Sequence, residues 1–541
     1  MSIAPAPRIV YRRPAAVGSG RPERCAIVIV GAGPVGLAAA LELARLGVRT
    51  VLLEKGDRLA TGSRSICWSK RTLEILDRSG TAGSMLGHGV VWQTGRVYRG
   101  KRQLYAFNLL PETGHRMPAF INLQQYHAEA CMIRRLQELG LADIRWCNEV
   151  TGVCNREADG ALVQVRTPDG EYGIEARYLL ACDGVHSTLR RALGLELVGR
   201  SFEERFLITD IRVEAGFPFE RRFYFEPAFH SGQSALLHRQ PDNLVRIDLQ
   251  LGPDADPERE SEPGRVTERI RRVVGPGTRF ELEWISVYSF SCRRMERFRH
   301  GRVFFAGDAA HVVSPFGARG GNGGIQDVDN LAWKLALVEA GAAPASLLDS
   351  YDDERVPAAD ENILNAARST DFMTPKNQAS ADLRDAVLSL AGSEPFARAL
   401  VNSGRLSLPH SYATSALNSP DDPGFGGLGP APGAPAIDAP LESGWLLEHL
   451  GGRFVLLCFT DVDGTGKPNG CEEILANAKP RIDVLVTEAT GLAARRWAAV
   501  PGSMYLLRPD QHVAARWREG CDATALTRAL ARACAGRETG Q

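Results

Sequence analysis

Strand-like and helix-like hydrophobic patterns alternate from residue 26 to about residue 195. Ala26–Val30 and Thr50–Leu53 are short apolar runs, and the residues between them have the spacing of a helix that ends near Gly47. Parallel strands need crossover connections, which are usually helices, so this alternation predicts a parallel sheet with helical crossovers. We expect an α/β domain over residues 25–200.

The pattern changes to a period of two in the next segment. Within Leu244–Leu251, the polar residues Arg246, Asp248 and Gln250 alternate with apolar residues. Successive side chains of a strand point to opposite faces, so these three polar residues share one face. We therefore expect a strand-rich substrate domain over residues 201–300.

The α/β pattern returns over residues 301–375, where apolar residues between Gly324 and Ala340 have helical spacing. The insert thus interrupts one nucleotide-binding domain rather than following it. Residues 376–435 are expected to form a helical connection and then a linker rich in proline and glycine. The apolar run Phe454–Phe459 predicts a buried strand in a small third domain over residues 436–541.

Charge and composition argue against several classes of function. Basic and acidic residues each number 64 in a chain of 541, so no net field attracts nucleic acid or an anionic membrane. Glycines interrupt the apolar segment Cys25–Ala44, which argues against a membrane span. Residues 1–24 carry arginines among prolines and glycines without the apolar stretch of a signal peptide, so we expect a flexible tail.

The cysteines favour a reducing compartment. There are eleven of them, no two have C-x-x-C spacing, and none lies near paired histidines. A disulfide framework and a metal site are both disfavoured, and a cytoplasmic location fits best.

The first predicted strand runs into a glycine-rich turn, Gly31-Ala32-Gly33-Pro34-Val35-Gly36, which fits G-x-G-x-x-G. Main-chain amides at the start of the next helix can hold a diphosphate, and an acidic residue that ends the second strand can accept hydrogen bonds from an adenosine ribose. A tight turn without a nucleotide is the alternative. The candidate residues at this end are Gly31, Gly33, Pro34, Gly36, Glu54 and Lys55.

A second motif lies far along the chain, where a strand over residues 302–306 runs into Gly307-Asp308-Ala309-Ala310-His311. The first motif does not distinguish NAD from FAD, whereas an NAD dehydrogenase has no need of the second. The two motifs together favour FAD.

Three motifs in order resemble those of the flavoprotein aromatic hydroxylases. They are the G-x-G-x-x-G turn, Asp183–Arg190 with the pattern D-G-x-x-S-x-x-R, and Gly307–His311 followed by Pro315 and Gly320–Asp327. The chain is similar to class A flavoprotein monooxygenases of the para-hydroxybenzoate hydroxylase fold, in the branch of phenol hydroxylase and 3-(3-hydroxyphenyl)propionate hydroxylase. The resemblance implies a Rossmann-like FAD-binding domain that is interrupted by the strand-rich substrate domain.

The resemblance also implies the chemistry. NAD(P)H, as a transient electron donor, reduces FAD, O2 adds to the reduced ring, and the resulting hydroperoxide hydroxylates a phenolic or other electron-rich aromatic substrate. The alternatives are a flavin-dependent dehydrogenase or oxidase without oxygen insertion, and a FAD-binding protein without turnover. A flavin halogenase is disfavoured, because its W-x-W-x-I-P signature needs two tryptophans two residues apart and the chain has none.

Several flavin contacts follow from the resemblance. Asp308 is expected to bind the ribityl chain of FAD, and the main-chain amides of Gly320, Gly321 and Asn322 are expected to face the pyrimidine edge of the flavin. The other cofactor candidates are Arg64, Gln125 or alternatively Gln124, Asp183 and Gly307. His311 is expected to be structural, because the motif gives it no partner.

The substrate pocket is expected between the flavin motif and the insert. The resemblance places the carbonyl of Pro315 near the reacting ring. Arg246, His238 and Tyr224 are the candidates on the insert, and Arg246 would bind an anionic group of a small aromatic substrate.

The third domain resembles the thioredoxin-like C-terminal domain of the phenol hydroxylase branch. Cys458 and Cys471 are too far apart in sequence to form a redox pair. The resemblance therefore implies a structural role for this domain, with a homodimer contact as one option.

Overall fold

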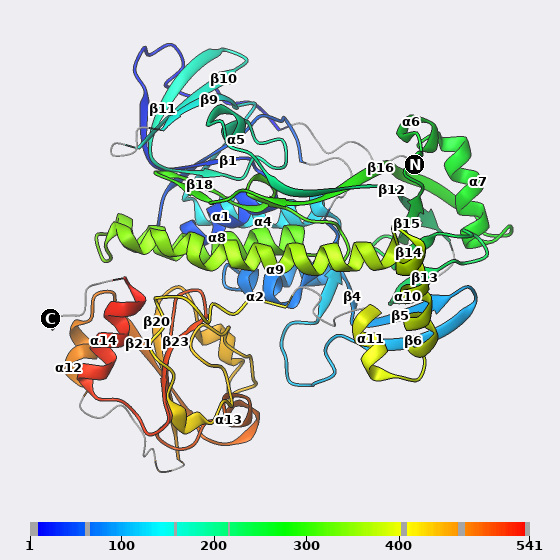
Figure 1. Ribbon diagram of the computed structural model, residues 1–541. Helices are drawn as coiled ribbons and strands as arrows, with labels where there is room; N and C mark the ends of the chain where they lie inside the picture. The colour runs from blue at the N-terminus through cyan, green and yellow to red at the C-terminus, as the bar shows by residue number, and fades with distance from the viewer. Residues whose placement is uncertain are drawn as a thin grey trace.

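The computed structural model describes residues 9–59, 65–155, 160–214, 217–401, 408–461, 463 and 471–535. Its strands form two eight-stranded sheets, one four-stranded sheet and one three-stranded sheet. Figure 1 shows the first large sheet above the long central helices, the second large sheet to one side, and the C-terminal unit below.

The first large sheet carries the predicted nucleotide-binding domain. Its strands are β1 (Glu23–Val30), β2 (Thr50–Glu54), β8 (Ala142–Trp146), β9 (Glu149–Asn155), β10 (Ala161–Thr167), β11 (Gly170–Ala181), β17 (Arg299–His300) and β18 (Val303–Phe305). The order is β17-β18-β11-β1-β2-β8, with β10 paired to β11 and β9 paired to β10. Because β18 pairs in parallel with β11, residues before and after the insert build one sheet.

The second large sheet contains the strands of the insert and two strands from earlier in the chain. Its strands are β5 (Thr94–Arg99), β6 (Arg102–Asn108), β12 (Val198–Val213), β13 (Arg221–Phe225), β14 (Ser234–Arg239), β15 (Leu244–Leu251), β16 (Phe280–Arg294) and β19 (His311–Val312). The order is β19-β16-β12-β15-β14-β13-β5-β6. The substrate domain expected over residues 201–300 is therefore incomplete, because β5 and β6 join it from earlier in the chain through a parallel pairing with β13. Such a long-range pairing leaves no local pattern in the sequence.

The smaller sheets and the helices complete the fold. The remaining strands are β3 (Cys67–Ser69), β4 (Val90–Trp92), β7 (Phe120–Asn122), β20 (Phe454–Thr460), β21 (Ile482–Glu488), β22 (Met504–Leu507) and β23 (Val513–Trp517). The α-helices are α1 (Pro34–Arg45), α2 (Lys70–Asp77), α3 (Ala82–His88), α4 (Gln125–Leu139), α5 (Thr188–Ala192), α6 (Pro257–Glu260), α7 (Pro263–Val274), α8 (Gly320–Glu339), α9 (Ser350–Met373), α10 (Gln378–Leu390), α11 (Pro395–Val401), α12 (Glu472–Asn477), α13 (Gly491–Trp497) and α14 (Ala523–Ala533). The 3-10 helices are η1 (Gly307–Ala309), η2 (Ala345–Asp349), η3 (Pro423–Phe425) and η4 (Leu446–His449).

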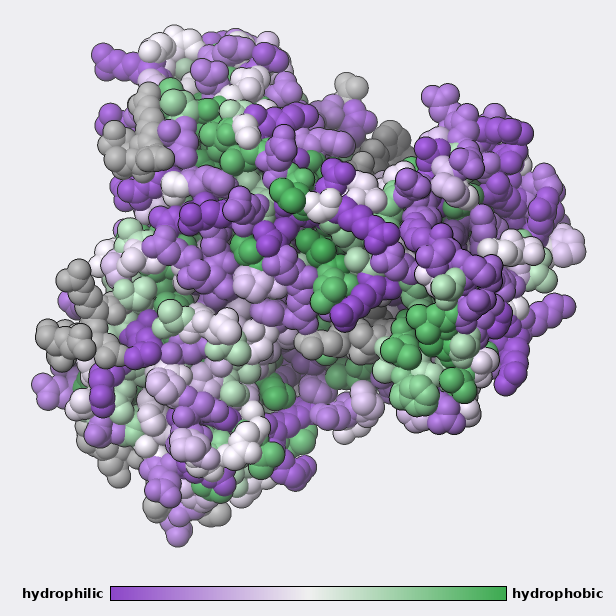
Figure 2. All heavy atoms as spheres, in the orientation of Figure 1, coloured by the Kyte–Doolittle hydropathy of each residue, from purple (hydrophilic) through white to green (hydrophobic). Residues whose placement is uncertain are grey.

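In the described ranges, no helix combines the length and the apolar composition that a bilayer crossing requires. Apolar side chains do gather on the surface over α10 and α11, at the lower right of Figure 2. Leu383, Phe396 and Leu400 are among the exposed apolar residues there. Patches of this kind are found at contact surfaces.

Two segments differ from the sequence-based expectation. Residues 9–22, expected to belong to a flexible tail, are packed: Ile9 donates to the carbonyl of Asp57 at 2.7 Å, and Val17 is buried in the main core. The expected Pro/Gly linker runs along β23, where the N–H of Gly433 donates to Val513 O at 2.7 Å. Both segments gain main-chain partners that composition alone does not predict.

Buried ion pairs join the C-terminal unit to the central helices. Arg508 donates to Glu354 of α9 at 2.5 and 2.9 Å, and Lys334 of α8 lies 2.7 Å from the same carboxylate. These three side chains are 0% exposed. Burial alone would raise the pKa of Glu354, but Arg508 and Lys334 outweigh it and hold the pKa below its ordinary value. The pairing therefore stabilises the fold at neutral pH and is lost as the pH falls towards this lowered pKa.

We expect Arg508→Met to lower the free energy of unfolding by about 3–5 kcal/mol, because it leaves a buried carboxylate with one cation instead of two. Urea denaturation measures this change. Arg453→Met is the control, since Arg453 pairs with Asp483 but its side chain is 63% exposed, and its loss should cost less than about 1 kcal/mol. Equal effects of the two substitutions would contradict this account.

Candidate active site

A groove of about 440 Å³ lies at the carboxyl ends of β1, β2, β11 and β18. Its lining includes the sequence candidates Gly31, Gly33, Pro34, Glu54, Lys55, Gln125, Asp183, Asp308 and Gly321. Ligands of doubly wound sheets bind at this edge, because the strand-to-helix turns leave a crevice there. The groove therefore gathers residues from three of the motifs that lie far apart in the chain.

The turn between β1 and α1 has room for a diphosphate. Gly31 has φ +100°, and a Cβ there would lie 2.5 Å from the carbonyl oxygen of Cys182, so only glycine fits. A Cβ at Gly33 would meet no described atom within 4 Å, which leaves open space in front of the helix. Gly33 is also the N-cap of α1 and offers no side chain to the first amides of the helix. Such amides are a suitable anion site.

Glu54 is held in place beside this turn. One carboxylate oxygen accepts from the N–H of Ala32 at 2.8 Å, and the other accepts from the N–H of Gly56 at 2.8 Å. Each oxygen retains acceptor capacity for a ribose hydroxyl. Gly36 lines no part of the groove, and a Cβ there would collide with the Gly31 carbonyl, so its role is the close packing of helix on strand.

Asp183 offers a polar atom that the described protein does not satisfy. Its Oδ2 accepts from the N–H of Leu189 at 3.2 Å. Its Oδ1 is buried and has no hydrogen-bond partner within the residues that the structure describes. Buried carboxylate oxygens are normally hydrogen-bonded. The unpaired oxygen of Asp183 beside the groove could accept a hydrogen bond from a cofactor rich in hydroxyl groups, as FAD is.

A buried carboxylate, Asp327, fixes the second motif. It accepts from the N–H of Gly307 at 3.0 Å and from His311 Nε2 at 2.6 Å, and its other oxygen pairs with Arg355 at 2.7 Å. Burial alone would raise the pKa of Asp327, but His311, Arg355 and the N–H of Gly307 lower it to about 2. His311 thus has the partner that its motif did not reveal. Asp308, next to Gly307, remains exposed in the groove.

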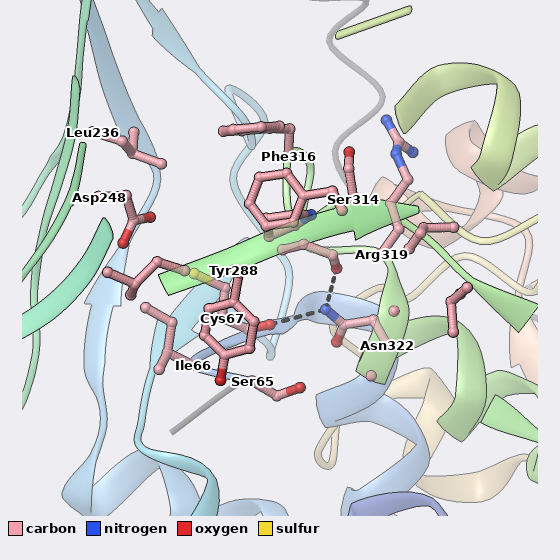
Figure 3. A pocket seen from close by; sticks show the side chains of 18 of the residues that line it. Ser65, Ile66, Cys67, Leu236, Asp248, Tyr288, Ser314, Phe316, Arg319 and Asn322 are labelled. Carbon is pink, nitrogen blue, oxygen red and sulfur yellow. Dashed lines mark hydrogen bonds between the residues drawn. The ribbon is translucent and has the colours of Figure 1, made fainter. Parts of the chain in front are cut away.

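The three residues expected at the pyrimidine edge form the first turn of α8, whose N-cap is Arg319. The side chain of Asn322 already has partners within the protein. Its oxygen accepts from the N–H of Ser69 at 3.0 Å, and its nitrogen donates to the carbonyl of Cys67 at 2.9 Å. Figure 3 shows the bond to Cys67. Only main-chain amides of this turn can therefore face a ligand. The Asn322 side chain instead positions β3 against α8.

Gln124 and Gln125 are the two alternatives for one cofactor contact, and they differ in their position relative to the groove. Gln125 lines the groove and accepts from the N–H of Ser65 at 3.3 Å. Gln124 is 1% exposed and does not line the groove. Gln125 is thus the cofactor candidate of the two. Arg64, the remaining candidate, lies outside the described residues.

A second cavity, of about 270 Å³, adjoins the groove and extends to the insert sheet (Figure 3). Ser65, Val185, Asp308 and Gly321 line both spaces, so the two are contiguous. Pro315 lines the cavity near the start of α8. The aromatic residues around it are Trp68, Trp284, Tyr288, Phe290 and Phe316. This arrangement suits an aromatic ring held next to a cofactor in the groove.

The structure corrects the choice of Tyr224. His238 and Arg246 line the cavity, but Tyr224 does not. Its ring stacks on Tyr98 with centroids 4.6 Å apart. On β13 the cavity residue is Arg221, and a residue three positions later points to the opposite face because strands alternate. Arg221 is not evident from the sequence, because its strand carries no clear alternation of apolar and polar residues.

Arg246 has a partner that the sequence does not reveal. Arg246 is 3% exposed, and its Nε and Nη2 donate to Asp210 at 2.8 and 2.7 Å. Asp210 lies directly opposite Arg246 in the pairing of β12 with β15. Two of the donors that would bind an anionic substrate are therefore already used. Only the sheet register reveals this partner, because Asp210 and Arg246 lie 36 residues apart in the chain.

The comparisons agree with the site. Residues 24–366 match the family described as FAD binding domain. The 3-(3-hydroxy-phenyl)propionate/3-hydroxycinnamic acid hydroxylase of Mycolicibacterium smegmatis is 28% identical over 90% of each chain. A flavin-dependent monooxygenase of Mycobacteroides abscessus is 34% identical over 62% of this chain and 71% of its own. The crystal structure of the flavin-dependent monooxygenase PieE in complex with FAD and substrate has the same fold, with a TM-score of 0.82 and 23% identity over 96% of this chain and 100% of that chain.

We expect Gly33→Val to weaken FAD binding more than tenfold, a loss of about 1.4 kcal/mol or more. The new side chain fills the space in front of α1 without touching the described protein, so folding should be unaffected. Flavin absorbance per mole of purified protein measures the result, with thermal unfolding as the check on folding. Gly277→Val is the control, because Gly277 also faces open space but lies far from the groove motifs in sequence and lines neither space. A folded Gly33→Val protein with full FAD content would refute the assignment.

Proposed function

The chain belongs to the FAD-binding family of flavoprotein aromatic hydroxylases, and from this premise we propose that it inserts one oxygen atom of O2 into an electron-rich aromatic ring. The observation that carries the proposal is the contiguity of the groove and the aromatic cavity through Ser65, Val185, Asp308 and Gly321. A substrate in the cavity and a cofactor in the groove can then meet with little water between them, as such chemistry requires. The overall reaction consumes NAD(P)H, a proton and O2, and it yields the hydroxylated product, NAD(P)+ and water.

The cofactor contacts follow from the site. Glu54 would accept from the adenosine ribose, the first amides of α1 would hold the diphosphate, and Asp183 and Asp308 would accept from hydroxyl groups of FAD. FAD, when bound and reduced, supplies the oxygen activation. The main-chain amides at the start of α8 lie at the positive end of a helix of 20 residues and would stabilise negative charge on the reduced ring. Pro315 would place its carbonyl near the substrate ring.

Phenols are the first substrate class to test. The relative from Mycolicibacterium smegmatis is named for two phenolic acids. The cavity offers aromatic faces for the ring, and its polar residues come from strands of the insert. We therefore propose a small phenol or related electron-rich aromatic compound as substrate.

We further propose that the C-terminal unit is thioredoxin-like and structural. Its element order is β20-α12-β21-α13-β22-β23-α14, and its sheet order is β21-β20-β22-β23 with β20 parallel to β21, which supports this fold. Burial and the neighbouring Cys471 raise the pKa of the Cys458 thiol to about 12. A thiol that stays protonated is a poor nucleophile, which supports a role in stability rather than in electron transfer.

An aerobic screen under ¹⁸O2 tests the proposed function. With a panel of phenols, we expect NAD(P)H consumption to rise when a substrate is present and one ¹⁸O atom to appear in each product molecule. Peroxide, measured separately, should account for a minor part of the NAD(P)H consumed. Stoichiometric peroxide without labelled product for every phenol and aromatic acid would instead indicate an oxidase.

The variant Leu236→Trp tests whether the substrate binds in the cavity. Leu236 lines the cavity from β14 and does not line the groove. The larger side chain should therefore remove stimulation by the phenol while FAD content stays unchanged. Unaltered stimulation in this variant would place the substrate somewhere other than the cavity.

A further inference from the structure

The cavity has a polar end on the insert sheet. The strand register places Arg221 opposite His238 and His238 opposite Arg246. Asp248 follows Arg246 by two residues, so both point to the same face. All four residues line the cavity.

This polar end lies away from the cofactor groove. Figure 3 shows Asp248 and Leu236 on one side of the cavity and Arg319 and Asn322, at the start of α8, on the other. Tyr288 and other aromatic side chains lie between the two sides. A ligand that reacts near α8 would therefore present its opposite end to Asp248 and Arg221.

Arg221 is a half-buried cation in the wall of the cavity. In the ranges that the structure covers, its guanidinium has no ion pair and no hydrogen bond, but it lies over the ring of Trp92, 5.9 Å from the centroid. Burial lowers the pKa of Arg221, and Asp248 acts in the opposite direction. Its neighbour on the strand, Arg222, donates to Glu220 at 2.7 Å, and Arg246 is paired with Asp210. Guanidinium N–H groups that are shielded from bulk water need acceptors, so a ligand bound in the cavity would supply them at Arg221.

Asp248 is the corresponding acceptor. Its Oδ1 is buried without a hydrogen-bond partner among the described residues. Burial raises the pKa of Asp248 to about 6, although Arg246 and Arg221 both act to lower it. His238 is neutral, because burial and the two arginines hold its pKa well below the ordinary range. When Asp248 is ionised, the two cations Arg221 and Arg246 balance the two anions Asp210 and Asp248. This end of the cavity then has no net charge.

On the basis of the proposed function, we infer that Arg221 and Asp248 together bind a neutral hydroxyl group of the substrate, at the end remote from the reacting ring carbon. A hydroxyl group both accepts and donates, so it can accept from the guanidinium and donate to the carboxylate. A ligand carboxylate can only accept, and it would bring a second negative charge beside Asp248 in a buried space. This end of the cavity thus selects a phenol or enol over an aromatic acid.

Ligand binding to the FAD-loaded protein tests this inference without turnover. Calorimetry at pH 7.5 compares 3-propylphenol with 3-phenylpropanoate, which have a similar size but carry a hydroxyl group and a carboxylate respectively. We expect the phenol to bind at least about tenfold more tightly, as one satisfied charged hydrogen bond implies. Equal or tighter binding of the carboxylate, or binding of neither probe, would overturn the inference. If the phenol binds with this preference but no phenol or aromatic acid of the ¹⁸O2 panel is hydroxylated, the proposed function is refuted and this inference stands.

Three variants separate the roles of the two residues. Asp248→Asn removes the negative charge at the same size, so it should reverse the preference and favour the carboxylate over the phenol. Arg221→Gln should weaken the phenol about tenfold or more. Arg222→Gln is the control, because Arg222 lies next to Arg221 in β13 but does not line the cavity, and its phenol affinity should be unchanged.

FAD content and thermal unfolding, measured for each variant, show whether it is folded. An Asp248→Asn protein that is folded and keeps the wild-type preference would overturn the role of Asp248. A similar loss in the Arg221 and Arg222 variants would overturn that of Arg221.

Discussion

The carboxylate of Asp327 is the interaction on which both spaces of the site depend. A buried charge is costly unless donors surround it, and here the N–H of Gly307, the ring of His311 and the guanidinium of Arg355 supply them. These groups come from η1, β19 and α9, while Asp327 itself lies on α8. One side chain therefore holds together the turn that presents Asp308 to the groove and the helix whose first turn borders the cavity.

Close packing reinforces this arrangement. A Cβ at Gly324 would lie 2.8 Å from the Cα of Gly307, so α8 and η1 approach as only glycine allows. Further along α8, Lys334 joins the buried ion pairs of Glu354 and Arg508, which attach the C-terminal unit. The helix is thus held near both of its ends, and this rigidity suits a site that must position a ring against a cofactor.

The candidates that local patterns single out gather in the groove, whereas the residues of the cavity depend on long-range pairing. The glycine turn, Glu54 and Asp308 each lie at or just after the end of an apolar strand, and their positions in the groove depend mainly on that local context. The register of β12 to β15 turns Arg221 to the cavity and sets Asp210 opposite Arg246, and a shift of one residue would turn each to the other face. The same dependence explains why Tyr224 was chosen wrongly and why the recruitment of β5 and β6 was missed.

The dissociation constant of FAD from an Asp327→Asn variant tests the central role of this carboxylate most directly. We expect it to rise at least about tenfold, since the neutral amide cannot hold the Gly307 turn and Arg355 together. Asp329→Asn is the matched control, because Asp329 lies on the same helix but pairs with Arg71 at 3.2 Å. It should lose stability while keeping its FAD affinity. Wild-type FAD affinity in a folded Asp327→Asn protein, or an equal loss in both variants, would contradict the account.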